Sequence, residues 1–260
     1  PEGIRTIAGR IHSIAAFLEK EINKLGYRQM NAQYFDTLRF ALPDNVSAQQ
    51  VRTVALSKEV NLRYFKNGDV GMSIDETTDL AAVNVLLSIF GIAAGKDYTK
   101  AADIPESCTI AEAFRRQSAY LTHEVFNKYH TETEMMRYIK RLDRKDISLA
   151  HSMISLGSCT MKLNAAAEML PLSRPEFMGM HPLVPEDQAE GYRELIHNLS
   201  EELKVITGFA GVSLQPNSGA AGEYAGLRVI RAYQESIGQG HRNKVLIPAS
   251  AHGTNPASAV

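Results

Sequence analysis

A block of small residues, Ser218-Gly-Ala-Ala-Gly-Glu223, lies between a short apolar stretch and a long helical pattern, and this arrangement constrains the fold more than any other feature. Residues 211–215 before the block are interpreted as a short strand, and residues 244–249, after the helical residues 224–237, as an apolar strand. A strand, a tight turn, a helix and a second strand form the opening unit of a parallel sheet. The sequence therefore predicts that a large α/β domain with a parallel sheet begins at about Leu156.

The first 95 residues carry a different pattern, in which helices and strands alternate in the order α-β-α-β-β-α. Ser47 and Gln50 have the spacing of a capping box, and Asn67-Gly68-Asp69 predicts a hairpin turn. Thr77 or Thr78 is expected to cap the last helix. We expect residues 1–95 to form a small α/β domain, a sheet with helices on one face. The expected helices span residues 4–26, 47–60 and 78–91, and the expected strands span residues 34–42, 61–66 and 70–74.

Residues 96–155 are polar and rich in Arg, Lys and Glu, and they lack the alternation that indicates a strand. We interpret this segment as a helical connector between the small domain of residues 1–95 and the large domain that residues 156–260 begin. The helices expected in the connector and in the large domain before its first strand span residues 111–129, 132–145, 165–170 and 186–207.

Composition excludes several classes of function. The 28 Lys and Arg residues balance 29 Asp and Glu residues, and the net charge of −1 gives no support to nucleic-acid binding. The most apolar stretch, residues 80–95, is shorter than the roughly 20 residues that a membrane-spanning helix needs. The two cysteines, Cys108 and Cys159, lack the spacing of a zinc site or a disulfide framework. We therefore expect an enzyme from a reducing compartment and predict no metal site.

Small residues at the start of a helix let backbone N–H groups and the helix dipole converge on an anion. We call Ser218, Gly219 and Ala220 the phosphate cup, because their position between a predicted strand and a predicted helix suits a phosphate group. Glycine at 219 is also expected to supply a backbone geometry that other residues disfavour. The spacing matches neither a P-loop nor a dinucleotide-binding turn, so a nucleotide is not indicated. The alternative is a tight turn whose glycines only permit close packing.

Polar residues also follow the second predicted strand, in the segment Ser250-Ala-His-Gly-Thr-Asn-Pro-Ala257. His252, Thr254 and Asn255 are therefore expected at the same sheet edge as the phosphate cup. A histidine there can stack on an aromatic ligand or transfer protons, but it can also be a loop residue with satisfied hydrogen bonds. A third polar segment, Leu156 to Asn164, suits the recognition of an anion or a carboxylate, with a capped loop as the alternative.

Three long motifs occur in order along the chain: Gly157-Ser-Cys-Thr-Met-Lys-Leu-Asn164, Gln215-Pro-Asn-Ser-Gly-Ala-Ala-Gly-Glu-Tyr-Ala-Gly226 and Ser250-Ala-His-Gly-Thr-Asn-Pro-Ala-Ser-Ala259. With these motifs the chain resembles the P-protein family of the glycine cleavage system, and the likeness extends more loosely over residues 1–95. The resemblance implies a pyridoxal-phosphate-dependent glycine dehydrogenase (decarboxylating) of fold type I. The chain would be an internal fragment: the small domain that closes the first half, the connector, and the start of the cofactor-binding domain of the second half.

The resemblance also implies the reaction and the site. Glycine would lose its carboxylate as CO2 while the cofactor ring accepts the electrons, and its aminomethyl group would pass to the lipoyl arm of H-protein. The implied residues are Ser218, Gly219, Ala220 and Thr254 for the cofactor, His252 for cofactor binding and catalysis, and Ser158, Thr160, Asn164 and Glu223 for the substrate.

In this family a lysine binds the cofactor as a Schiff base, and it would lie beyond Val260, because no lysine follows His252. The fragment alone is therefore expected to be inactive. The full enzyme would be a homodimer in the cytoplasm of a bacterium, or in the mitochondrion of a eukaryote, and would bind neither nucleic acid nor membrane. Two alternatives stay open: another fold-type-I enzyme, such as an aminotransferase or a desulfurase, and a non-catalytic interaction fragment.

Overall fold

The computed structural model describes residues 1–107, 109–148, 151 and 165–259 of the 260-residue chain. The chain divides into two compact units, Pro1–Leu142 and Asp143–Val260. The boundary between them falls inside the segment that is predicted to be a connector. Over the described ranges, no helix combines the length and the apolar character needed to cross a membrane.

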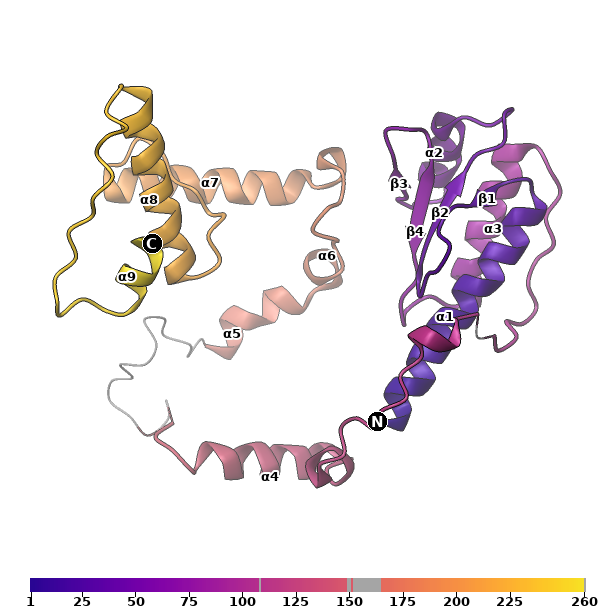
Figure 1. Cartoon of the computed structure of the whole chain (residues 1–260), viewed down its shortest axis with the longest axis horizontal. Helices are drawn as coiled ribbons and strands as arrows, with labels where there is room; N and C mark the ends of the chain where they lie inside the picture. Colours follow the sequence, from indigo (N-terminus) through magenta and orange to yellow (C-terminus); the bar gives the residue numbers. More distant parts are fainter. Residues whose placement is uncertain (108, 149–150, 152–164, 260) are drawn as a thin grey trace. The chain divides into compact units, whose positions relative to one another are not determined.

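The first unit is built on a four-stranded antiparallel sheet with the strand order β1-β2-β4-β3 (Figure 1). Three helices pack on one face of this sheet, as the sequence predicts. The elements are α1 (Glu2–Lys24), β1 (Arg28–Gln29), β2 (Thr37–Ala41), α2 (Ala48–Ser57), β3 (Arg63–Tyr64), β4 (Val70–Ser73) and α3 (Leu80–Ala94). The short strand β1 is not among the predicted elements.

The core of the first unit lies between the sheet and the helices. Leu38 and Phe40, two positions apart on β2, point to the same face and are fully buried. The strand register places Leu38 opposite Met72 and Phe40 opposite Val70 on β4. The ring of Phe40 lies 5.7 Å from the ring of Phe90 on α3, so the side chains packed between the strands also contact this helix.

Two local signals in this unit are confirmed. Ser47 Oγ accepts a hydrogen bond from the N–H of Gln50, and the Gln50 side chain accepts one from the N–H of Ser47, which completes the capping box. Strands β3 and β4 pair antiparallel around the predicted hairpin turn. Gly68 in that turn has a φ of 91°, a backbone region that favours glycine.

The start of α3 differs from the prediction. Asp79, and neither Thr77 nor Thr78, accepts the hydrogen bond from the first turn of the helix. The hydroxyl groups of both threonines instead donate to Asp75, and these hydrogen bonds, with that of Thr77 the strongest influence, lower the pKa of the Asp75 carboxyl. Helix α3 also continues past the predicted end, until Gly95 closes it with a φ of 63°.

The helix predicted over residues 111–129 is wrong. The chain there is largely extended, with short 3-10 turns at Glu112–Phe114 and Glu124–Asn127. Tertiary hydrogen bonds hold this segment: Tyr120 Oη donates to the carbonyl oxygen of Pro1 at 2.8 Å, 119 positions away. Such anchoring outweighs a weak local preference for helix. The next predicted helix is confirmed as α4 (Glu132–Asp143).

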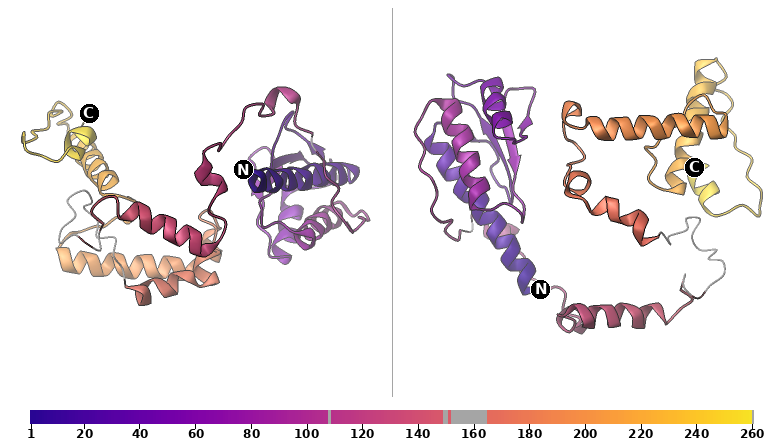
Figure 2. Two further views of the ribbon diagram at one scale, coloured as in Figure 1. Left: turned by 90° about the horizontal axis from the view of Figure 1, so that it is seen from below. Right: turned by 180° about the vertical axis from the view of Figure 1, so that it is seen from behind.

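The second unit consists of helices joined by irregular segments (Figure 2). The helices predicted over residues 165–170, 186–207 and 224–237 are all present. The last of them begins earlier than expected, at Gly219, because the block of small residues belongs to its first turn. The α-helices are α5 (Ala166–Met169), α6 (Pro175–Met178), α7 (Glu190–Thr207), α8 (Gly219–Ser236) and α9 (Thr254–Ala259), with 3-10 turns at Leu170–Ser173 and Glu186–Gln188.

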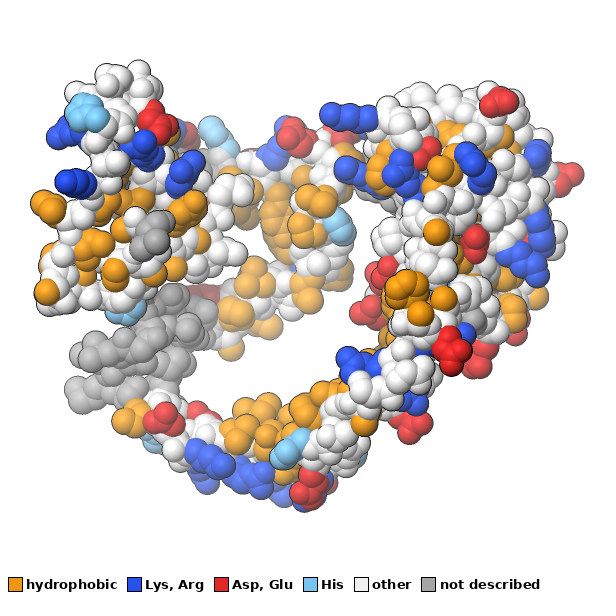
Figure 3. Space-filling model, viewed as in Figure 1, with side chains coloured by type: hydrophobic (Ala, Val, Ile, Leu, Met, Phe, Trp, Pro, Cys, Tyr) orange, Lys and Arg blue, Asp and Glu red, His pale blue; other side chains and the backbone are white. Residues whose placement is uncertain are grey.

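The strands predicted over residues 211–215 and 244–249 are not formed, and the described part of the chain contains no parallel sheet. An extended segment needs neighbouring strands for its backbone N–H and C=O groups, and neither segment has such a neighbour here. Among the described residues, none beyond Ala94 is a buried hydrophobic residue, although Tyr98, Ala101 and Ile104 pack against the core of the first unit. Leu246 is 96% exposed. Figure 3 shows hydrophobic side chains gathered on the surface of the C-terminal part of the chain.

Candidate functional site

The phosphate cup forms the N-terminus of helix α8. Ser218 is the N-cap residue, and its Oγ accepts a hydrogen bond of 3.1 Å from the N–H of Ala221. The first N–H groups of an α-helix have no carbonyl partner within the helix, so those of Gly219 and Ala220 are directed out of the helix end. The 18-residue helix adds its dipole, which favours an anion at this end.

The space beside the backbone of Gly219 is open. A β-carbon built on Gly219 meets no heavy atom within 4 Å. Gly219 also has no positive φ, so the expected need for glycine geometry at this position is wrong. The reason is that Gly219 is the first residue of a regular helix and not part of a tight turn. The structure therefore leaves room for a side chain at Gly219.

His252 lies in the turn that leads into α9. Its Nδ1 lies 2.9 Å from Thr254 Oγ1 and accepts a 3.3 Å hydrogen bond from the backbone N–H of Thr254. An imidazole nitrogen that accepts from an N–H group carries no proton, so in the neutral ring the proton is on Nε2. The predicted pair His252 and Thr254 is thus in direct contact, with the Nε2–H group available to a ligand.

The first turns of α8 and the start of α9 face one another. The carboxamide of Asn255, oriented with its nitrogen toward Glu223, donates to the two carboxylate oxygens at 3.0 and 3.3 Å. A shallow hollow of about 360 Å³ lies between the two helices. Its lining comprises Gly222, Glu223, Gly226, Leu227 and Ile230 of α8, residues 245–248, and Asn255 and Ser258 of α9. Glu223 and the His252 turn, predicted from separate motifs, are therefore brought together.

The remaining predicted residues, Ser158, Thr160 and Asn164, lie outside the described residues. Asn255 stands in the same motif as His252 and is expected beside it, but the sequence assigns Asn255 no role in binding or catalysis. Its contact joins two helices that are far apart in sequence, and no local spacing signals such a pair.

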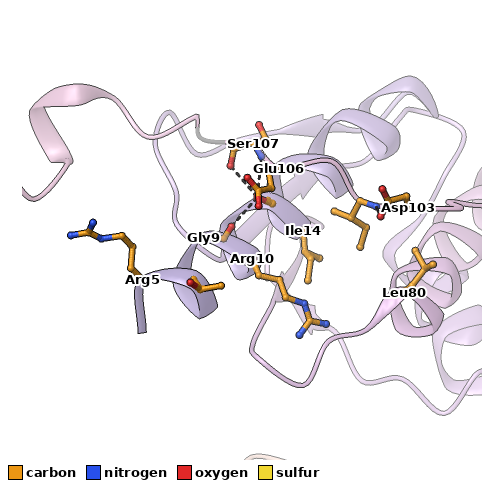
Figure 4. A pocket seen from close by; sticks show the side chains of 11 residues that line it. Arg5, Gly9, Arg10, Ile14, Leu80, Asp103, Glu106 and Ser107 are labelled. Atoms are coloured by element: carbon orange, nitrogen blue, oxygen red, sulfur yellow. Dashed lines mark hydrogen bonds between the residues drawn. The ribbon is translucent and has the colours of Figure 1, made fainter. Parts of the chain in front are cut away.

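A second hollow, of about 840 Å³, lies in the first unit beside α1 (Figure 4). Two of its polar side chains already have structural partners. Arg10 donates to the carbonyl oxygen of Thr78 at 2.9 Å, and Ser13 Oγ bonds to Gly9 and Ser107. Within the described ranges no three His, Cys, Asp or Glu side chains are grouped as metal ligands would be.

A capped helix N-terminus, and an imidazole on a turn that Asn255 bonds to the same helix, offer N–H donors and an aromatic ring of the kind that would suit a phosphate ester with an aromatic body. The donor set fits such a group, because the cup supplies N–H donors and His252 supplies a ring and a proton. A nucleotide-binding motif is not part of this arrangement.

Comparison with known proteins points to one family. The family model described as glycine cleavage system P-protein matches residues 1–90. Proteins named glycine dehydrogenase (decarboxylating) from Bacteroides fragilis (strain YCH46) and Bacteroides thetaiotaomicron are 84% and 82% identical to this chain over 259 residues. The protein of that name from Christiangramia forsetii is 51% identical over 260 residues.

Each of these comparisons covers 100% of this chain but 27% of the relative. The chain therefore spans about a quarter of the length of the curated relatives that it matches. The resemblance to the P-protein of the glycine cleavage system is confirmed, for a segment of that protein.

Proposed function

We propose that this chain is part of a glycine dehydrogenase (decarboxylating), an oxidoreductase of glycine catabolism. The observation that carries the proposal is the 84% identity, over the whole chain, to the Bacteroides fragilis protein of that name. The relatives named above come from bacteria, which favours the cytoplasm over the mitochondrion. The enzyme acts as a homodimer and binds neither nucleic acid nor membrane.

The cofactor of the proposed enzyme is pyridoxal phosphate, which when bound supplies an electron sink for the loss of the glycine carboxylate as CO2. Ser218, Gly219 and Ala220 hold the phosphate through N–H groups at the start of α8. His252 would lie against the pyridine ring, and its Nε2–H would be free to donate, because Nδ1 is occupied by Thr254. Thr254 thereby fixes the orientation of the imidazole.

The substrate site requires residues from more than one segment. Ser158, Thr160 and Asn164 supply hydroxyl and amide groups for the glycine carboxylate, and Glu223 borders the same site. The aminomethyl group that remains after decarboxylation passes to the lipoyl arm of H-protein. This assignment rests on the motif and on the position of Glu223 beside the His252 turn.

We also propose how the segment fits a fold-type-I enzyme. Residues 1–95 form the small domain that closes the first half, residues 96–155 connect the halves, and residues 156–260 begin the cofactor-binding domain. In the full-length protein, residues 211–215 and 244–249 pair with neighbouring strands as a parallel sheet. The exposed apolar residues before α9, such as Leu246, support this proposal because a sheet position would bury them.

A chimera tests the proposed function. The matching segment of the Bacteroides fragilis relative is replaced by this sequence, and the chimera is assayed with pyridoxal phosphate and lipoylated H-protein for exchange of labelled bicarbonate into glycine. We expect exchange that depends on all three components. The 260-residue chain alone is the control and should give no exchange, since no lysine follows His252. A chimera that folds and binds the cofactor but decarboxylates another amino acid in place of glycine would contradict the proposal.

A further inference from the structure

The side chain of Glu223 has a specific partner within the second unit. Both of its carboxylate oxygens accept hydrogen bonds from the Asn255 carboxamide, at 3.0 and 3.3 Å. Glu223 is five positions after the N-cap Ser218, so its backbone belongs to the same end of α8 as the phosphate cup. A carboxylate accepts hydrogen bonds only, so the contact also fixes which end of the Asn255 amide faces α8.

Asn255 is in turn bonded to the histidine turn. Its backbone N–H donates to the carbonyl oxygen of His252 at 3.0 Å. The imidazole of His252 is bonded to Thr254 through both the hydroxyl group and the backbone N–H. Asn255 therefore connects the Glu223 carboxylate to the backbone of His252, while Thr254, the residue before Asn255, holds the His252 ring.

This connection matters because the cup and the histidine come from different segments. The phosphate would be held at the start of α8, whereas His252 follows an irregular segment that extends from residue 242 to residue 248. Within the described ranges, the contact between Glu223 and Asn255 is a polar bond between the side chains of α8 and α9. It therefore has the geometry to set the position of the imidazole relative to the cup.

We propose that Glu223 is a positioning residue, which holds Asn255 and thereby keeps the His252 imidazole in register with a phosphate-bearing ring bound at the cup. The inference rests on the proposed function and goes beyond it, because it assigns Glu223 a role through another residue and not through contact with glycine. Asn255 is the intermediate in this role.

The test uses the chimera described above, with Glu223→Ala, Glu223→Gln and, as a matched control on the same helix, Glu235→Ala. Glu235 is paired with Arg231 at the far end of α8, away from the cup. With Glu223→Ala we expect the bound pyridoxal phosphate to stay near stoichiometric, because the cup is intact. The visible circular dichroism of the bound cofactor should fall, and kcat should fall on the order of tenfold to a hundredfold, as a misplaced group predicts. KM for glycine should change little.

Two further readouts separate positioning from other roles. Without the cofactor, amide hydrogen exchange at residues 252–255 should be faster in Glu223→Ala than in the parent and in Glu235→Ala. Glu223→Gln retains one acceptor oxygen and should restore most of the dichroism and of kcat.

Several results would overturn the inference. The first is unchanged dichroism in Glu223→Ala. The second is a rise in KM with kcat unchanged, which would indicate direct contact with glycine. The third is a Glu223→Gln variant whose dichroism and kcat are no better than those of Glu223→Ala. A parent chimera that binds no pyridoxal phosphate would refute the proposed function, and this role with it. If the parent chimera binds the cofactor and Glu223→Ala has the same dichroism and kcat as the parent, only the positioning role is refuted.

Discussion

The backbone N–H of Thr109 donates a 3.0 Å hydrogen bond to Nε2 of His12, which lies 97 positions earlier in the chain. The His12 side chain is buried, and its Nδ1 lies 2.8 Å from the carbonyl oxygen of Phe35. Since Nε2 accepts from an N–H group, the ring proton is on Nδ1 and is donated to Phe35. A single imidazole thus ties the extended segment after α3 to α1 and to the loop before β2.

Replacement of this imidazole should loosen the extended segment. His12→Ala leaves the Phe35 carbonyl and the Thr109 N–H without a partner and opens a cavity, so we expect the free energy of unfolding of the first unit to fall by roughly 3 kcal/mol. Urea unfolding of the 260-residue chain measures this loss, and amide exchange at Thr109 should accelerate. The exposed His130→Ala is the control and should change stability by less than about 0.5 kcal/mol. Unaltered exchange at Thr109 would show that other contacts hold the segment.

Alkaline pH should destabilise the first unit through Tyr27. Burial raises the pKa of Tyr27 to about 12, and its hydroxyl donates to the Phe90 carbonyl oxygen at 2.9 Å. An unfolded tyrosine ionises near pH 10. The stabilisation by the neutral phenol is therefore complete below pH 10 and is lost as the pH rises from 10 to about 12. Urea midpoints at pH 9, 10 and 11 follow the loss, and Tyr27→Phe should flatten this dependence. An equally steep decline in Tyr27→Phe would assign it to other groups.

Two glycines within helices should respond in opposite directions to alanine. A β-carbon on Gly91 of α3 would lie 2.7 Å from Tyr98 Cδ1 and 3.2 Å from the Lys96 carbonyl oxygen, so Gly91→Ala should destabilise by about 1–3 kcal/mol. A β-carbon on Gly9 of α1 meets nothing within 4 Å, and Gly9→Ala should stabilise by up to about 1 kcal/mol through helix propensity. Thermal unfolding of both variants tests the pair. A stabilising Gly91→Ala would mean that Tyr98 moves aside without cost.

Charge and size can be separated at the phosphate cup. In the chimera, Gly219→Asp places a carboxylate beside the N–H groups that are proposed to bind phosphate, and we expect loss of bound pyridoxal phosphate. Gly219→Ala is the matched control and should retain the cofactor, because its β-carbon meets no neighbour within 4 Å. Cofactor content by absorbance after purification is the measurement. If Gly219→Asp still copurifies with stoichiometric cofactor, the phosphate binds elsewhere.

Removal of the cap hydroxyl should have a smaller effect than the added charge. Ser218→Ala removes the acceptor for the Ala221 N–H and a donor for the phosphate. We expect cofactor binding to weaken by about 1–3 kcal/mol without being abolished. Titration of the cofactor-free chimera with pyridoxal phosphate gives the dissociation constant. Binding as tight as in the parent would exclude the hydroxyl from the phosphate site.

Local signals explain which parts of the fold could be predicted. The capping box of Ser47 and Gln50 and the hairpin at Gly68 each depend on residues within four positions, and both are confirmed. The cap of α3 was misplaced because three neighbouring residues can each cap a helix, and Asp75 competes for the two threonines. The strands at 211–215 and 244–249 depend on pairing with other segments, which no local pattern supplies.

The candidate site follows the same rule. A helix next to the small-residue block could be predicted from the apolar periodicity after Tyr224, but α8 begins at Gly219, earlier than expected, because the block supplies its cap and first turn. Phosphate binding by the cup stays a prediction. The contact between Glu223 and Asn255 could not be predicted, because it depends on how α9 packs against α8.

The edges of the small sheet have a consequence for behaviour in concentrated solution. β1 and β3 at the two edges are each two residues long, and beyond β1 the side chain of Asn31 donates to the Thr37 carbonyl oxygen at 3.2 Å. Little main chain is left at either edge to serve as a template for another molecule. The first unit should therefore resist edge-to-edge aggregation.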